Sequence, residues 1–442
     1  MIHLRHTIAE CARLIVGLTF VASGLLKAVD PVGTALKITE YLAPVFAFTG
    51  HSHSLALALS FVLCAGEFIL GAFLLAGSYR RVCARFAFVF MILMTLVTGY
   101  ILIADPVSDC GCFGDALHLT NLQTFLKNLV LLPLSYLVLR DASALRHLFS
   151  LRERWVPTIL ALGGIIFFLV ENYRHLPLFD FRPYTVGLKL DEAIIAEEEQ
   201  FQRAALQSTS YIYEKAGEQR SFSPEALPDS SWTFVRVQDS LALKAFKPKY
   251  DFAPVDSLGY PMAEELLTDP GVTLLLLAPS WDAANQSVID EVGELATQAA
   301  SLGYRFYGLT ASGAEEIARW RYQTGATYPM LQMDPTPIRT MIRAYPGLLV
   351  LRGGQIIDKR AYSDFPKVEE VTAYLKELGD PKHPLPTPSY VRTYPLLLWA
   401  LVLVLAFLRF WARKLHLTLY LKRRIHYSHI KEIDNEKEHR RR

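Results

Sequence analysis

The sequence predicts a membrane protein that combines a bundle of membrane-spanning α-helices with a separate α/β domain. Its 442 residues are 52% hydrophobic with a mean hydropathy of +0.23, which is more apolar than a typical soluble domain. Long apolar stretches fill most of the first 173 residues. Residues 174–390 instead alternate short apolar runs with turns and amphipathic segments, the pattern of an α/β domain.

Six apolar segments are long enough to cross a bilayer, which requires about 20 residues. They cover roughly residues 9–28, 54–77, 82–104, 122–140, 155–173 and 393–412. The first of them lies where a signal peptide would lie. However, Glu10 and Arg13 interrupt its apolar run and no small-x-small cleavage site follows, so we expect it to be retained as a span.

The charges of the connecting loops predict the orientation of the spans, because loops rich in Lys and Arg stay in the cytoplasm. Basic residues follow the second, fourth and sixth spans, whereas residues 105–121 contain neither Lys nor Arg. We therefore expect residues 105–121 and the α/β domain to lie outside the cytoplasm. In a bacterium this corresponds to a multi-pass protein of the inner membrane with its large domain on the periplasmic side.

The net charge of +2 conceals an uneven distribution. Residues 174–390 contain 21 Lys and Arg against 29 Asp and Glu, whereas residues 411–442 contain 10 against 4. A basic tail directly after an apolar span predicts contact with the lipids of the inner leaflet. Nucleic acid is not expected as a partner, because no aromatic platform or groove-reading motif accompanies the basic residues.

Two cysteines one residue apart, Cys110 and Cys112, lie between the third and fourth predicted spans. Such a pair suits thiol–disulfide exchange, in which one thiolate attacks a disulfide and a second thiol resolves the mixed disulfide. A Cys-x-Cys ring is small and strained, which favours a labile bridge, and Gly111 has no Cβ to obstruct it. An inert structural disulfide and half of a metal site are the alternatives. No metal site is predicted, because His118 alone would not complete a zinc site.

The first 140 residues resemble DoxX/MauE-like membrane proteins. The similarity rests on the segment 13–41, on Gly66-Glu67-Phe68 in the second span, and on the motif of residues 109–115, Asp-Cys-Gly-Cys-Phe-Gly-Asp. The cysteine motif is the most specific part and is similar to that of the MauE branch, with Gly111, Phe113 and Gly114 supporting it. The resemblance implies a four-helix membrane bundle whose Cys110 and Cys112 exchange disulfides outside the cytoplasm. It also makes a quinone a candidate cofactor.

Two ionisable residues lie inside the predicted spans, Arg13 in the first and Glu67 in the second. Intramembrane charges are costly and are usually paired or functional. Because consecutive spans run in opposite directions, the two side chains fall at similar depths, and we expect an intramembrane polar pair, Arg13 with Glu67. Such a pair either locks the bundle or takes part in proton or quinone chemistry. Lys27, near the outer end of its span, is expected to reach toward the headgroups.

The soluble region is expected to contain a helix over 191–206, a hairpin from residue 210, and a larger domain at about 248–380. The larger domain has predicted strands at 272–278, 304–309, 347–351 and 355–361 and predicted helices at 282–302, 313–322 and 368–378. This order resembles the thioredoxin fold, which places a cis-proline where Pro346 lies. The redox cysteines of that fold would fall in residues 278–285, Ala-Pro-Ser-Trp-Asp-Ala-Ala-Asn, which contain none. The domain is therefore expected to bind a partner rather than to exchange disulfides itself.

These observations divide the chain into a membrane bundle at 1–150, a fifth span at 151–175, an extracytoplasmic region at 176–390, a sixth span at 391–412 and a basic cytoplasmic tail at 413–442. The predicted function is membrane-linked thiol–disulfide exchange through Cys110 and Cys112, with an extracytoplasmic polypeptide or redox protein as partner. The alternative is a non-enzymatic scaffold or assembly factor for envelope proteins. A transporter built around Glu67 is a third hypothesis.

Overall fold

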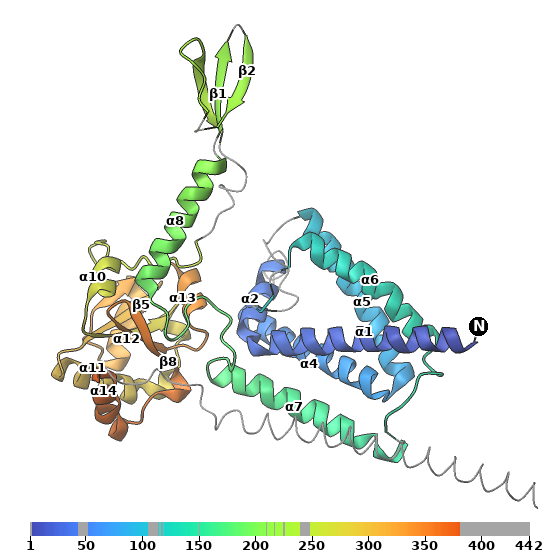
Figure 1. Cartoon of the computed structure of the whole chain (residues 1–442). Coiled ribbons are helices and arrows are strands. Elements are labelled where there is room, and N and C mark those ends of the chain that lie inside the picture. The colour runs from blue at the N-terminus through green and yellow to red at the C-terminus, as the bar shows by residue number, and fades with distance from the viewer. Residues whose placement is uncertain are drawn as a thin grey trace, which may run out of the picture. The chain divides into compact units, whose positions relative to one another are not determined.

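The computed structural model describes residues 2–42, 52–104, 114, 116–117, 119–149, 151–208, 210–215, 217–223, 226–238 and 248–380. These residues form two compact units that divide between Tyr173 and Arg174 (Figure 1). The first unit is helical and the second is α/β, as the sequence predicts. The sixth predicted span and the basic tail lie outside the described residues.

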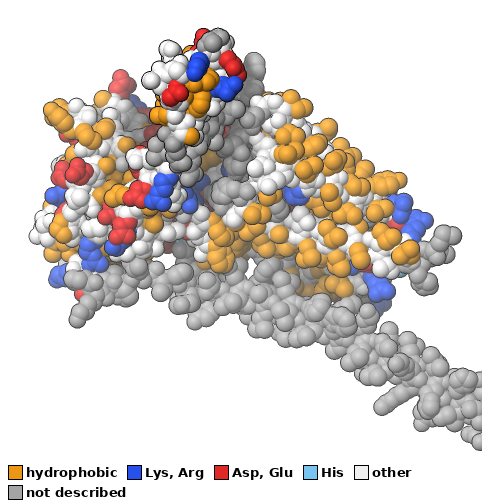
Figure 2. Space-filling view, turned by 45° about the horizontal axis from the view of Figure 1, so that its top comes forward, with side chains coloured by type: hydrophobic (Ala, Val, Ile, Leu, Met, Phe, Trp, Pro, Cys, Tyr) orange, Lys and Arg blue, Asp and Glu red, His pale blue; other side chains and the backbone are white. Residues whose placement is uncertain are grey.

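The helical unit contains six α-helices in its described part. They are α1 (Ile2–Val29), α2 (Pro31–Tyr41), α4 (Ser52–Ala76), α5 (Arg80–Ala104), α6 (Asn121–Arg140) and α7 (Trp155–Arg174). All but α2 are long and apolar enough to cross a membrane. In Figure 2, hydrophobic side chains cover much of the visible face of this unit, and many large apolar side chains of α1, α4, α5, α6 and α7 are exposed, as expected for contact with lipid.

Helix α2 occupies a segment that follows the first predicted span and that the sequence analysis did not identify as helical. Asp30 caps it, because its Oδ1 accepts a hydrogen bond of 2.7 Å from the backbone N–H of Gly33. Pro31 occupies the first turn, where its missing N–H costs nothing. Ser60 of α4 donates a 2.7 Å hydrogen bond to the Pro31 carbonyl, so α2 packs against the first half of α4.

Helices α1 and α4 approach closely along a line of glycines. A Cβ added at Gly24 would lie 2.5 Å from the backbone nitrogen of Phe68, and one added at Gly71 would lie 2.6 Å from that of Val21. Small residues permit this approach between membrane helices, where close packing replaces the hydrophobic driving force. The contact sets the register of the two helices, with Gly17 opposite Gly71 and Gly24 opposite Cys64 and Phe68.

The α/β unit is built on a five-stranded sheet of order β6-β5-β4-β7-β8. Its strands are β4 (Val272–Ala278), β5 (Arg305–Thr310), β6 (Met330–Gln332), β7 (Gly347–Arg352) and β8 (Gln355–Ala361). β4, β5 and β6 are parallel, whereas β7 and β8 run antiparallel to their neighbours. All seven residues of β4 are buried, as expected for a strand covered on both faces.

Helices cover both faces of this sheet. One core lies against α11 (Ile289–Ser301), α12 (Ala314–Thr324) and α14 (Val371–Gly379), and a second lies against α10 (Ala263–Thr268) and α13 (Pro335–Met341). The succession of strands and helices and the antiparallel β7–β8 pair confirm the predicted thioredoxin-like fold. β6 and α13 are additions to the predicted order, and the sequence analysis missed them because each has seven residues or fewer.

The helix predicted over 282–302 begins instead at Ile289. Two short 3-10 turns, Trp281–Ala283 and Gln286–Val288, precede it. The backbone N–H of Asn285 donates to the carbonyl of Tyr345 at 2.9 Å, while its side chain accepts from the N–H of Ser287 at 2.8 Å. These bonds hold Ala284 and Asn285 in an extended conformation, so the helix cannot start earlier.

Helix α8 (Leu190–Ser208) confirms the predicted helix and leads into a small second sheet of order β2-β1-β3. Its strands are β1 (Ser210–Lys215), β2 (Glu218–Phe222) and β3 (Thr233–Gln238). The predicted hairpin is β1–β2, with Gly217 at a φ of +82° in the turn. Aromatic rings gather on this sheet, where Phe222 meets both Tyr213 and Trp232 edge to face.

Candidate functional site

A buried ion pair joins α1 and α4 in the interior of the helical unit. Lys27 Nζ lies 2.7 Å from both carboxylate oxygens of Glu67. Both side chains are only 4% exposed. Nζ also donates to the hydroxyl of Ser23, one turn earlier on α1, at 2.9 Å. Within the part of the chain that the structure describes, the ammonium group contacts these three acceptor oxygens, and the Glu67 carboxylate compensates its charge.

The predicted pairing of Arg13 with Glu67 is wrong. Arg13 binds Glu10 at 2.8 Å and donates to the carbonyls of Leu74 and Leu75 at the end of α4, at 2.7 and 3.0 Å. The cause is the register of the two helices. The first turns of α4 extend beyond the end of α1, and α2 packs against this extension. Glu67 consequently lies opposite Lys27, which is buried rather than extended toward the headgroups.

Two cavities adjoin the ion pair. A cavity of about 20 Å³ is lined by Ser23, Lys27, Glu67, Asn128 and Lys127 together with apolar side chains of α5 and α6. This volume is sufficient for one water molecule, which needs a cavity of about 10–15 Å³ and several polar partners. A second cavity of about 200 Å³ extends from Lys27 between α2, α4 and α5, where Thr34, Lys37 and Tyr41 supply its polar groups.

The predicted redox motif lies mostly outside the described residues, which is the case for Cys110, Gly111, Cys112 and Phe113. Gly114 is described. It has a φ of +59°, and a Cβ there would lie 2.9 Å from the carbonyl oxygen of Leu26 and 3.7 Å from the Cα of Lys27. Gly114 therefore packs against the last turn of α1, at the residue that carries the buried ammonium.

The end of β4 in the α/β unit is the place where thioredoxin-like folds carry their cysteines. Here Trp281 is buried and stacks on Trp320 with ring centroids 4.6 Å apart. Asp282 is exposed and forms an ion pair of 2.8 Å with Arg319. The Tyr345–Pro346 peptide bond is cis. The site thus retains the backbone arrangement of the fold, but no thiol follows Cys112 anywhere in the sequence.

Comparison with protein families identifies the membrane region. Residues 5–140 match the family described as methylamine utilisation protein MauE. This match covers α1 to α6 and contains the Lys27–Glu67 pair and the cysteine motif; the broader likeness to DoxX stays a prediction. Residues 208–244, around the small sheet, match a family described as a domain of unknown function, DUF8463. A search of the curated proteins finds no match to this chain.

Several solved structures are similar to the α/β unit. A secreted Mycobacterium tuberculosis disulfide oxidoreductase is 13% identical, covers 28% of this chain and 94% of its own, and gives a TM-score of 0.23. A thioredoxin-family thiol:disulfide interchange protein from Chlorobium tepidum is 18% identical, with coverages of 28% and 91% and a TM-score of 0.21. A mutant of Xanthomonas campestris peroxiredoxin Q is 15% identical, with coverages of 29% and 92% and a TM-score of 0.22.

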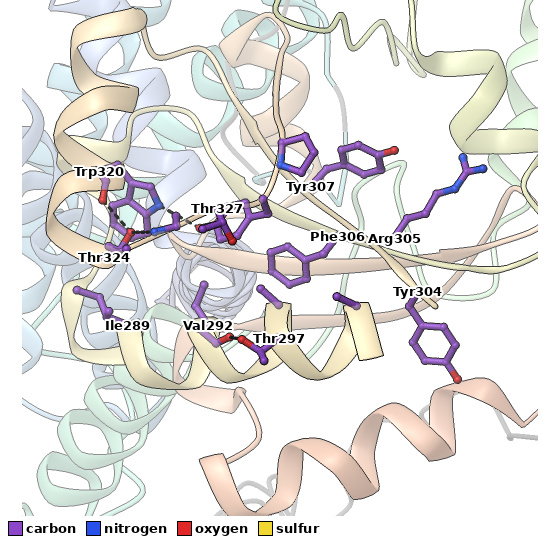
Figure 3. A pocket seen from close by; sticks show the side chains of 17 residues that line it. Ile289, Val292, Thr297, Tyr304, Arg305, Phe306, Tyr307, Trp320, Thr324 and Thr327 are labelled. Atoms are coloured by element: carbon purple, nitrogen blue, oxygen red, sulfur yellow. Dashed lines mark hydrogen bonds between the residues drawn. The ribbon is translucent and has the colours of Figure 1, made fainter. Parts of the chain in front are cut away.

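A groove of about 610 Å³ lies at the edge of the large sheet, between α11, β5 and the end of α12 (Figure 3). Val292 and Thr297 of α11 line one side, and Phe306 and Trp320 line its interior. β6 pairs only with Gly308–Thr310 of β5, so the first half of β5 borders this groove. Its described lining contains no Cys, His, Asp or Glu, and its polar side chains include Tyr304, Arg305 and Tyr307.

A second buried ionic cluster lies where the chain enters the α/β unit. Asp180 accepts hydrogen bonds from Arg182 Nε at 2.8 Å and Lys359 Nζ at 2.7 Å. Burial raises the pKa of the Asp180 carboxyl, but the charges and hydrogen bonds of Arg182 and Lys359 outweigh this effect and lower the pKa to about 2. Burial and the charge of Arg182 lower the pKa of the Lys359 ammonium to about 7, although Asp180 opposes the shift. This cluster ties the entering segment to β8.

Lys27 is the member of the buried ion pair that the sequence did not reveal. Its place near the outer end of the apolar run predicts a contact with the headgroups. Its partner, Glu67, can be identified only once the register of α1 and α4 is known. The spacing of Gly17, Gly24 and Gly71 was the signal that could have set this register, since small residues mark the contact line between membrane helices.

Proposed function

We propose that this protein performs thiol–disulfide exchange at the membrane, with Cys110 and Cys112 as its redox pair. The observation that carries the proposal is the packing of Gly114 against Leu26 and Lys27. Cys112 is two positions before Gly114 in the sequence, and the MauE-like bundle on which Gly114 packs contains a buried ion pair.

The α/β unit supports this role by binding rather than by electron transfer. It contains no cysteine, so a partner that it holds must exchange electrons with the pair in the MauE-like region. An extracytoplasmic polypeptide that carries a disulfide or dithiol is the partner we propose. The absence of Lys and Arg from residues 105–121 supports the same side of the membrane for both parts, because basic loops remain in the cytoplasm.

A redox titration of the Cys110–Cys112 pair in native membranes tests this function. The full chain is equilibrated in defined dithiol–disulfide buffers, free thiols are alkylated, and the labelling of each cysteine is read from its peptide. We expect a midpoint above about −250 mV, because labile, catalytic disulfides are more oxidising than structural ones, which lie below about −300 mV. A Cys11→Ser variant, altered at an exposed thiol of α1, should keep the same midpoint.

The scaffold hypothesis has one observation in its favour, the loss of both cysteines from residues 278–285. It predicts a different outcome of the same experiment. A bridge that resists reduction until the protein is denatured, in a chain whose Cys110→Ser/Cys112→Ser variant retains its function, would remove the exchange reaction and leave the scaffold.

A further inference from the structure

The first half of β5 is an edge of the large sheet and borders the groove beside α11 (Figure 3). β6 bonds only to the second half of this strand. The backbone N–H of Gly308 donates to the carbonyl of Pro329 at 2.9 Å. The N–H of Met333 donates to the carbonyl of Thr310, also at 2.9 Å. Because the backbone groups of successive residues point to opposite sides of a strand, Phe306 presents its N–H and C=O on the same side as Gly308, toward the groove.

Pro329 is the reason that the ladder between β5 and β6 stops short of Phe306. In a longer ladder, the N–H of residue 329 would donate to the Phe306 carbonyl, but proline has no N–H. Within residues 248–380, the structure shows no hydrogen-bond partner for the edge-facing N–H and C=O of Phe306. Phe306 is only 7% exposed, and buried backbone groups without partners are costly. A ligand that supplies both partners would remove this cost.

The wall of the groove that α11 forms leaves room for the side chains of such a ligand. Gly293, Ala296, Thr297 and Ala300 line this wall, and all four are small. A Cβ added at Gly293 would have no atom within 4 Å. The lining part of α11 begins at Ile289 and ends at Ala300, a length of about 16 Å at 1.5 Å per residue. This length matches about five residues of extended chain.

The charges of the groove match an uncharged ligand. Among the described lining residues, Arg305 alone carries a charge. Its guanidinium is already bound by two carboxylates, that of Glu265 at 2.8 Å and that of Asp269 at 3.2 Å. The other lining side chains are aliphatic, aromatic or threonine. A charged ligand side chain would therefore be buried here without an opposite charge, which is unfavourable.

We propose that this groove binds an extended, uncharged segment of the partner polypeptide, which adds to β5 as a further strand of the sheet. One carbonyl of the segment accepts from the N–H of Phe306, and one of its N–H groups donates to the Phe306 carbonyl. Alternate side chains of the segment then point toward the small residues of α11. Because it assigns the place where the partner is held, this inference rests on the proposed function, although no cysteine takes part in the binding.

Hydrogen exchange of the Phe306 amide tests the pairing directly. It is measured by mass spectrometry, resolved to single residues, on the full chain in lipid nanodiscs. The probe is a pool of end-capped peptides of about seven residues, built from Gly, Thr, Val, Leu and Phe. At about ten times its apparent Kd, the pool should slow exchange of the Phe306 amide about tenfold, because only the free chain exchanges. The amides of Arg305 and Tyr307, which belong to the residues paired with β4, should not change.

A matched pair of variants shows whether the peptides occupy the groove. Gly293→Trp fills the groove from a position with open space around its Cβ, and it should raise the apparent Kd about tenfold or more. Gly313→Trp is the control, because Gly313 also has open space around its Cβ but does not line the groove. A second pool, N-methylated at its central amides, keeps the side chains but cannot donate to the Phe306 carbonyl, and it should not protect the Phe306 amide.

Three outcomes would overturn the inference. The first is a free chain in which the Phe306 amide already exchanges as slowly as that of Tyr307, since this chain or a second copy would then already pair with the edge. The second is a lack of protection by the pool up to about 1 mM. The third is protection that persists in Gly293→Trp or with the N-methylated pool, which would place the peptides elsewhere or show apolar contact without strand pairing.

The same measurements separate this inference from the function on which it rests. The Cys110→Ser/Cys112→Ser variant should bind the pool as the wild type does. A chain that binds the peptides but whose cysteine pair resists reduction until the protein is denatured contradicts the proposed function and leaves the groove as a peptide site. A chain with a labile cysteine pair and no peptide binding contradicts only the inference.

Discussion

Replacing Gly71 by alanine should weaken the contact between α1 and α4. The new Cβ would lie 2.6 Å from the backbone nitrogen of Val21, 2.7 Å from the Gly17 carbonyl oxygen and 2.9 Å from the Phe20 Cβ. Two of these are backbone atoms, so the helices have to separate by several tenths of an ångström. Overpacking of this kind costs about 1–3 kcal/mol, and the separation also weakens dispersion contacts along the interface.

Gly66 provides the matched control for this substitution. It lies on the same helix five residues earlier, and a Cβ there has no atom within 4 Å. Both substitutions give the same gain in helix propensity, up to about 1 kcal/mol for an exposed glycine in water. The difference between Gly71→Ala and Gly66→Ala therefore isolates the interface, and we expect Gly71→Ala to be less stable by about 2 kcal/mol.

The assay follows the unfolding of the full chain in mixed micelles with increasing fractions of a denaturing detergent. The alkylation of Cys64, which is fully buried between α1 and α4, reports the opening of this contact and is quantified on its own peptide. Equal unfolding midpoints for Gly71→Ala and Gly66→Ala would refute the close approach of the two helices. The register that brings Lys27 to Glu67 would then be wrong as well.

Three further outcomes follow from the structure. Gly114→Val should change the alkylation rates of Cys110 and Cys112 several-fold, because a left-handed φ costs a residue with a Cβ about 1–2 kcal/mol; unchanged rates would show that the loop is not anchored there. Asp180 has a lowered pKa of about 2, so its contribution of about 2 kcal/mol is present above pH 4 and is lost as the pH falls toward 2. Hydrogen exchange of the β8 amides measures this loss, which Asp180→Asn should abolish. The pKa of Lys359 is lowered to about 7, so local stability should rise between pH 7 and 10. A stability that does not change over this pH range would contradict the lowered pKa of the buried ammonium.

The apolar spans were predictable because a bilayer imposes a length of about 20 residues that local composition reveals directly. The thioredoxin-like order was predictable for a similar reason, since a strand buried on both faces, such as β4, forms an uninterrupted apolar run. Short elements were missed. β6 has three residues, too few for any periodicity to be recognised, and only its pairing with Gly308–Thr310 identifies it.

The candidate site was harder to predict because pairing between helices depends on register, which the length and composition of the apolar spans do not reveal. Arg13 and Glu67 are at similar depths only if α4 begins at the level where α1 ends. Asp30 and Pro31 are a standard cap and first-turn pair, and recognising them would have predicted α2. With the additional length of α4 accounted for, Lys27 rather than Arg13 is the basic residue opposite Glu67.

The two units of this chain hold different parts of the chemistry that an exchange reaction needs. Both redox candidates belong to the MauE-like region, which also contains the buried ion pair, whereas the thioredoxin-like unit has a groove and no thiol. Any exchange at a cysteine of this chain must therefore use a thiol of the membrane region, and under the proposed function the α/β unit holds the partner. Alterations in the groove, such as Val292→Arg, should then slow exchange with a protein partner while leaving exchange with oxidised glutathione unchanged, a separation that a single combined active site would not permit.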